Sequence, residues 1–132
     1  MSLGEFRVLV VDDEKNICDL LKQAMERADC LVETVCEGHL ALERAQKTQF
    51  DAIFLDIKMP GMNGVEVLKN LRQTQPKAAF VMITGYACSE LVDESLSSGA
   101  FICLSKPFGL AQVMDVIKTI REEKELVQTT AE

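Results

Sequence analysis

The sequence predicts an α/β fold, in which a doubly wound, five-stranded parallel sheet carries helices on both faces. Four short apolar runs, at residues 8–11, 52–55, 80–83 and 101–104, are rich in β-branched residues. Together with a fifth strand-like segment at residues 31–36, these runs alternate with segments whose apolar residues recur at helical spacing. The runs are continuous rather than alternating, as in strands buried on both faces of a parallel sheet. Because strands and helices alternate along the chain, the helices are expected to cover both faces. The 132 residues suit one such domain.

The first half of the chain holds the first three expected strands and the two helices between them. Strands are expected at residues 6–11, 31–36 and 50–55. The first helix is expected to begin within residues 13–16, because acidic side chains stabilise a helix N-terminus, and its apolar spacing continues to Ala28. The second helix is expected after Gly38, and its helical spacing of apolar residues ends by Gln49.

The second half begins with a loop at residues 59–64 that is dense in turn-forming residues. A helix follows this loop and ends before Pro76. The remaining strands are expected at residues 79–83 and 101–104, and the remaining helices at residues 89–98 and 110–123. The domain is therefore expected at residues 5–123. A short extension or cloning remnant would precede it at 1–4, and a polar, frayed tail or start of a linker would follow at 124–132.

Composition and charge narrow the functional classes. The formal net charge of −7 argues against direct binding of nucleic acid or of an anionic membrane surface. No apolar run approaches the roughly 18 residues that span a bilayer, and no signal-peptide pattern opens the chain. The five cysteines form no C-x-x-C pair, so they are expected to be small, buried apolar residues in a reducing compartment. A cytoplasmic protein is expected.

Polar side chains follow four of the expected strands. Asp12 and Asp13 come after the first strand, and Asp56, Thr84 and Lys106 come after or near the ends of three others. Ligands of an open parallel sheet bind outside the carboxyl ends of its strands, so these side chains are expected to gather there. Three carboxylates at one edge would repel one another, and an all-oxygen set suits a hard cation such as Mg²⁺.

The chemistry expected of this group is phosphoryl transfer. A carboxylate such as Asp56 can act as a nucleophile on phosphorus, while Lys106 supplies a compact positive charge and Thr84 a hydroxyl donor. Taken singly, each residue has an ordinary structural explanation: helix capping for Asp12, Asp13 and Thr84, and a solvated surface for Lys106. Their joint occurrence at one sheet edge favours the functional explanation.

Four pieces of sequence resemble the receiver domain of two-component response regulators. They are residues 8–14 (VLVVDDE), 55–64 (LDIKMPGMNG), 83–87 (ITGYA) and 104–108 (LSKPF). Their order and their places at strand ends make the resemblance specific, and it extends over about residues 5 to 123. The resemblance implies a flavodoxin-like receiver fold that binds Mg²⁺.

The resemblance also implies roles for single residues. Asp56 would be the phosphoacceptor. Asp13 would bind Mg²⁺ directly and Asp12 would assist, with Asp56 and the backbone carbonyl of Lys58 completing the protein ligands. The phosphoryl group would be contacted by Thr84 and by Lys106, whose peptide bond to Pro107 would be cis.

One position departs from the family pattern. Receivers usually have Tyr or Phe three residues before the conserved lysine, as a switch, and this chain has Cys103 there. Phe101 lies two residues earlier, on the same face of the strand. A differently built switch is therefore expected. Lys58 and Tyr86 occupy the positions that tune the lifetime of the phosphate in the family.

The resulting functional hypothesis is a signalling module. The only histidine, His39, lies away from the acidic edge, so the donor is expected to be another protein, a sensor histidine kinase or a histidine phosphotransfer protein. The output is expected through a further domain or partner, and pairing with a second copy stays open. The module would act only on its own phosphorylation and dephosphorylation. The alternatives are a phosphate-independent docking receiver and a haloacid-dehalogenase-type phosphatase, whose second aspartate is replaced here by Lys58.

Overall fold

The computed structural model describes residues 5–59, 61–85 and 90–131. A five-stranded parallel sheet has the strand order β2-β1-β3-β6-β7, as the alternation of strands and helices predicts. Its strands are β1 (Phe6–Val11), β2 (Cys30–Val35), β3 (Ala52–Asp56), β6 (Ala79–Thr84) and β7 (Ile102–Ser105). Two short strands, β4 (Lys58–Met59) and β5 (Met62–Asn63), form an antiparallel pair after β3.

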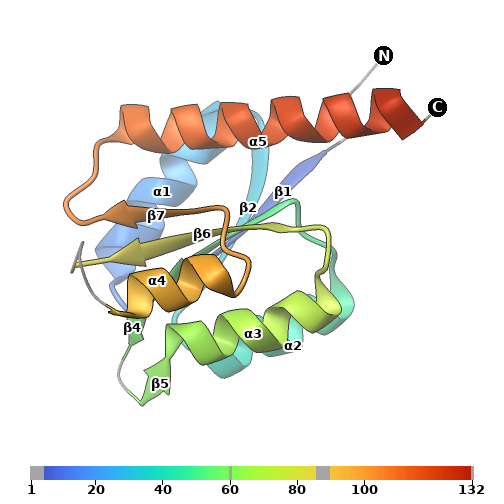
Figure 1. Ribbon diagram of the computed structural model, residues 1–132. Coiled ribbons are helices and arrows are strands. Elements are labelled where there is room, and N and C mark those ends of the chain that lie inside the picture. The colour runs from blue at the N-terminus through green and yellow to red at the C-terminus, as the bar shows by residue number, and fades with distance from the viewer. Residues whose placement is uncertain (1–4, 60, 86–89, 132) are drawn as a thin grey trace.

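Five helices cover the two faces of the sheet (Figure 1). The helices are α1 (Lys15–Arg27), α2 (Gly38–Lys47), α3 (Gly64–Thr74), α4 (Glu90–Ser97) and α5 (Leu110–Ala131). Helices α1 and α5 pack on one face, and α2, α3 and α4 pack on the other. Successive side chains of β1 point to opposite faces of the sheet. Val8 and Val10 pack in the core under α1 and α5, and Leu9 and Val11 pack in the core under α2, α3 and α4. Both faces of the sheet are therefore buried, as the continuous apolar runs predict.

The strand order reverses at β1, which lies between β2 and β3. In this topology, a crevice opens outside the carboxyl ends of the strands at the point of reversal. Asp12 directly follows β1, and Asp56 is the last residue of β3. The topology alone therefore brings these two carboxylates to the place where such folds bind ligands.

Sequence predictions need correction at α1, β2 and β7. Helix α1 begins at Lys15, so Glu14 is its N-cap and no acidic residue lies in its first turn. Strand β2 ends at Val35, and Cys36 is exposed rather than buried because it lies beyond the last residue of this edge strand. Strand β7 begins at Ile102, so Phe101 precedes the strand. Cys88 lies outside the described residues.

The polar tail continues α5 instead of fraying. The α5 helix runs to Ala131, well past residue 123. Its side chains are anchored on distant loops, because Arg121 donates hydrogen bonds to the carbonyls of Ala28 (2.7 Å) and Asp29 (3.1 Å), and Lys124 donates one to the carbonyl of Lys77 (2.8 Å). In the described part of the chain, no helix is both long and apolar enough to cross a membrane.

Candidate functional site

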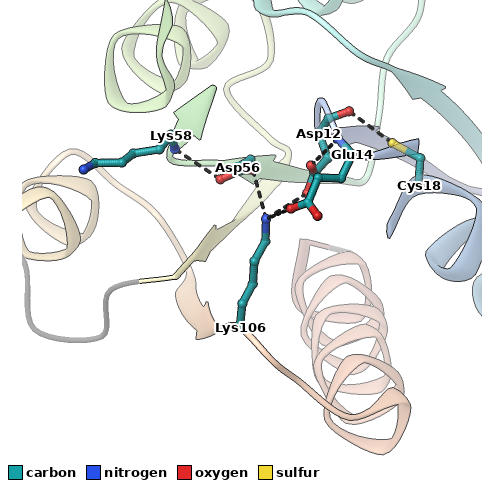
Figure 2. A network of polar contacts seen from close by, with 6 residues as sticks. All are labelled: Asp12, Glu14, Cys18, Asp56, Lys58 and Lys106. Atoms are coloured by element: carbon teal, nitrogen blue, oxygen red, sulfur yellow. Dashed lines mark hydrogen bonds and ion pairs between the residues drawn. The ribbon is translucent and has the colours of Figure 1, made fainter. Parts of the chain in front are cut away.

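The structure brings the predicted polar residues together at the carboxyl ends of β1, β3, β6 and β7. Figure 2 shows the polar contacts of three of them, Asp12, Asp56 and Lys106. Carboxylate oxygens of Asp12, Asp13 and Asp56 all lie within 4.8 Å of one another. Thr84 is the last residue of β6, and Lys106 follows β7. The carbonyl of Thr84 accepts a hydrogen bond from the backbone N–H of Lys106 (2.7 Å), which fixes these two positions side by side.

Asp12 is the most deeply buried member of the group. Its side chain has no exposed surface. Its Oδ1 accepts a hydrogen bond from the backbone N–H of Glu14 (2.9 Å), whereas Oδ2 accepts none from the residues that the structure describes. Burial raises the pKa of Asp12 to about 6; the hydrogen bond from Glu14 opposes this rise and the charge of Asp56 adds to it. The site thus holds a carboxylate oxygen that lacks a hydrogen-bonded partner and is costly to ionise.

The backbone of Asp12 is held from both sides. Its N–H donates to the carbonyl of Val35 (3.2 Å), and its carbonyl accepts a hydrogen bond from the thiol of Cys18 (3.3 Å). Burial and, to a smaller extent, the nearby Asp12 charge raise the pKa of the Cys18 thiol to about 11. Cys18 is therefore a neutral donor that orients the strand end, in agreement with its predicted burial on a helix.

Asp56 is almost fully buried and has two different oxygen environments. Its Oδ1 accepts a hydrogen bond from the backbone N–H of Lys58 (3.1 Å), and its Oδ2 lies 3.1 Å from Nζ of Lys106. Only 4% of the residue is exposed. This carboxylate therefore faces the open edge of the sheet with one oxygen beside a backbone donor and the other beside an ammonium group.

Lys106 is the cation at the centre of the carboxylates. Its Nζ lies 2.8 Å from Oε1 of Glu14, 3.1 Å from Oδ2 of Asp56 and 3.6 Å from Oδ2 of Asp12. Burial lowers the pKa of the Lys106 amine, but the hydrogen bonds to Glu14 and Asp56 more than offset this, so the net pKa lies above its ordinary value. The amine is positively charged at neutral pH. The predicted cis peptide bond between Lys106 and Pro107 is confirmed.

The loop after Asp56 is closed by a tight approach of α3. A Cβ on Gly64 would lie 2.7 Å from both Cα and the carbonyl oxygen of Ile57, and the Gly64 N–H donates to that carbonyl (2.7 Å). The side chain of Asn63 caps α3 by accepting a hydrogen bond from the N–H of Val65 (2.8 Å). The turn-rich sequence thus becomes a short β4–β5 hairpin that holds the backbone next to Asp56.

The structure describes three of the residues predicted to switch or tune the site, namely Cys103, Phe101 and Lys58. Cys103 is half-buried against the α2–α3–α4 core, and burial raises the pKa of its thiol. Phe101, in contrast, is 36% exposed and belongs to neither core cluster. Lys58 is exposed on β4. Tyr86 lies outside the described residues. Phe101 therefore does not occupy the place of Cys103.

The donor set fits a hard divalent cation. Asp12, Asp13 and Asp56 offer oxygen ligands only, and Oδ2 of Asp12 is a buried acceptor without a hydrogen bond among the described residues. A bound cation would satisfy that oxygen and offset the mutual repulsion of the three carboxylates. These residues are therefore suited to hold Mg²⁺.

Sequence reasoning missed Glu14 as a member of the site. Its carboxylate is the nearest acidic partner of Lys106, although the sequence analysis places Glu14 only in a helix start and at the end of the motif at residues 8–14. The available signal was its position directly after Asp13, at the same sheet edge. That signal indicates proximity, but not the direction of a long side chain.

Comparison with known proteins agrees with this geometry. The chain matches the response regulator receiver domain family over residues 8–118. Sporulation initiation phosphotransferase F of Bacillus subtilis is 30% identical over 112 residues, which cover 85% of this chain and 90% of that protein. The alkaline phosphatase synthesis transcriptional regulatory protein PhoP of B. subtilis is 35% identical over 128 residues, which cover 96% of this chain but 52% of that protein.

A solved structure has the same fold. A CheY-like response regulator receiver domain protein from Methanospirillum hungatei superposes with a TM-score of 0.88 and 32% sequence identity, over 92% of this chain and 98% of that chain. The fold and the site define a phosphoacceptor module of the CheY-like, flavodoxin-like class. The chain belongs to the response regulator receiver domain family, whose members are phosphorylated on an aspartate in two-component systems. Receiver domains bind Mg²⁺ in an acidic pocket and interact with histidine kinases and output domains.

Proposed function

We propose that Asp56 is the phosphoacceptor of this receiver, in a Mg²⁺-dependent reaction whose donor is a sensor histidine kinase or a histidine phosphotransfer protein. The observation that carries the proposal is the position of the Asp56 carboxylate. It is buried at the carboxyl edge of the sheet, 3.1 Å from the Lys106 ammonium and within 4.8 Å of the carboxylates of Asp12 and Asp13. An acceptor, a cation and a metal-binding pair are the parts that phosphoryl transfer requires.

In the proposed transfer, a carboxylate oxygen of Asp56 bonds to phosphorus while the bond from phosphorus to the donor's imidazole nitrogen breaks. The imidazole leaves with that electron pair. Lys106 holds the phosphoryl oxygens by its charge, and the hydroxyl of Thr84 donates a hydrogen bond to them. Bound Mg²⁺ would supply further charge compensation for these oxygens. Asp13 and Asp56 would hold the ion with the carbonyl of Lys58, and Asp12 would assist.

We also propose how the signal leaves the site. The added phosphoryl charge would draw Thr84 inward and change the surface beside Cys103. An output domain or a partner protein would recognise the changed surface. Cys103 in place of an aromatic residue would make this switch differ from the family pattern, with Phe101 outside its path. Lys58 and Tyr86 would set the lifetime of the phosphate.

The chain would work in the cytoplasm and would have no separate substrate. We include pairing with a second copy of the chain in the same proposal.

The test is phosphorylation by a small donor. The protein is incubated with acetyl phosphate and Mg²⁺, and its intact mass is recorded beside Asp56→Asn and a chelator-treated control. The expected result is a gain of one phosphoryl group that both controls abolish. A wild-type protein that gains no phosphoryl group and binds no beryllofluoride would instead be a docking receiver. A gain that survives Asp56→Asn would place the acceptor elsewhere.

A further inference from the structure

Glu14 provides the shortest ion pair to Lys106. The distance from Oε1 of Glu14 to Nζ of Lys106 is 2.8 Å, shorter than the distances from Asp56 (3.1 Å) and Asp12 (3.6 Å). The Glu14 side chain is 56% exposed, whereas those of Asp56 and Asp12 are 5% and 0% exposed. The ammonium thus bridges a buried pair of site carboxylates and one carboxylate at the solvent-facing mouth (Figure 2).

The backbone of Glu14 is fixed, but its carboxylate is not used to cap the helix. Its N–H donates to Oδ1 of Asp12, and its carbonyl accepts hydrogen bonds from the N–H groups of Ile17 and Cys18. Although Glu14 is the N-cap of α1, its side chain makes no capping hydrogen bond. The carboxylate is directed instead to Lys106. The start of α1 therefore positions an acidic group against the cation of the site.

We infer that Glu14 is a positioning residue that competes with the incoming phosphoryl group for Lys106, and so restrains phosphorylation of Asp56. The inference rests on the proposed function. An ammonium group has three N–H donors, and two of them are engaged by Glu14 and Asp56. A phosphoryl group on Asp56 draws the ammonium of Lys106 toward its oxygens, and the ion pair with Glu14 opposes that movement. The exposure of Glu14 makes this contact weak enough to be exchanged.

Two substitutions separate the contact from the charge. Glu14→Gln removes the charge, and Glu14→Asp keeps it but shortens the side chain so that it no longer reaches Lys106 as closely. The matched control is Glu43→Gln, which makes the same chemical change at an exposed position on α2. The probes are acetyl phosphate with Mg²⁺, for the rate constant of phosphorylation, and beryllofluoride with Mg²⁺, for the dissociation constant.

The expected result is a rate constant roughly two- to fivefold higher for both Glu14 variants than for the wild type, the size expected for loss of an exposed ion pair. Beryllofluoride should bind tighter by a similar factor, and Glu43→Gln should match the wild type in both measurements. The gain of Glu14→Gln should shrink as ionic strength rises, because salt screens the wild-type ion pair. A merely structural role for Glu14 would lower thermal stability without this salt dependence.

Other outcomes overturn the inference. If Glu14→Gln is faster but Glu14→Asp equals the wild type, the charge at the mouth acts without the contact, and the competition for Lys106 is wrong. If Glu14→Gln is no faster, or is slower, while the wild type is phosphorylated normally, the inference fails and the proposed function stands. A wild type that neither takes up phosphoryl groups nor binds beryllofluoride overturns both.

Discussion

Gln75 and Asp12 are polar side chains with no exposed surface, but they lie at opposite ends of the sheet and are satisfied differently. Gln75 follows α3, beside the amino ends of β3 and β6. Its Oε1 accepts a hydrogen bond from the N–H of Phe50 (2.9 Å), and its Nε2 donates to the carbonyls of Ala45 (2.9 Å) and Thr48 (2.7 Å). This neutral amide joins the end of α2 to the segment that enters β3.

Asp12 has the opposite character. It carries a charge, one of its oxygens lacks a hydrogen bond among the described residues, and burial raises its pKa to about 6. A fully bonded neutral group stabilises the fold, whereas a buried and partly bonded charge weakens it unless a ligand completes its environment. The amino end of the sheet, which holds Gln75, is therefore structural, and the carboxyl end, which holds Asp12, is functional.

The largest effect that tests the comparison is expected for Gln75→Ala. The substitution leaves the N–H of Phe50 and the carbonyls of Ala45 and Thr48 without their partner, so the free energy of unfolding should fall by about 3 kcal/mol. Urea unfolding measures the change. The control, Gln73→Ala, alters an exposed residue of α3 and should shift stability by less than about 0.5 kcal/mol. Equal losses in the two variants would contradict the structural role of Gln75.

A smaller effect of opposite sign is expected for Asp12→Asn. Removing the buried charge should raise the free energy of unfolding of the metal-free protein by about 1–2 kcal/mol, because the cost of ionising Asp12 disappears. The same variant should lose stabilisation by Mg²⁺, which requires the carboxylate. Thermal unfolding with and without Mg²⁺ measures both effects. Asp19→Asn, on the exposed side of α1, is the control and should change neither. A destabilised Asp12→Asn protein would remove the basis of the comparison.

Much of this arrangement could be predicted because it depends on local patterns. Continuous apolar runs predict strands that are buried on both faces. The polar residues that follow these runs indicate the carboxyl edge of the sheet. Asp12, Asp56, Thr84 and Lys106 therefore could be assigned to one edge before any geometry was known. Each of them lies at or just after a strand end, where the backbone alone determines its neighbourhood.

The features that could not be predicted depend on long-range contacts. Nothing around Gln75 in the sequence indicates that its amide meets the end of α2, about thirty residues away. The polar tail from residue 124 is expected to fray, but α5 continues to Ala131 and Lys124 donates a hydrogen bond to the carbonyl of Lys77. In each case a side chain's partners lie far away in the sequence.

The smallest effect is the pH dependence of the difference between the wild type and Asp12→Asn. Because the pKa of Asp12 is raised from its ordinary value of 3.8 to about 6 in the folded protein, the folded state binds more protons than the unfolded state between these values. The contribution of Asp12 to stability is therefore fully present below about pH 4 and is lost as pH rises through about 6. The advantage of Asp12→Asn should be small at pH 4 and reach its plateau near pH 7.

Metal-free unfolding free energies of the two proteins, measured across this range, test the prediction, since carboxyls away from the site titrate alike in both proteins and cancel in the difference. Saturating Mg²⁺ should reduce or reverse the plateau, because an ion that binds only the folded, ionised site adds stability to the wild type alone. A difference that does not change between pH 4 and 7 would mean that Asp12 ionises as easily in the folded protein as in the unfolded chain. In that case burial alone would not distinguish the functional end of the sheet from the end held by Gln75.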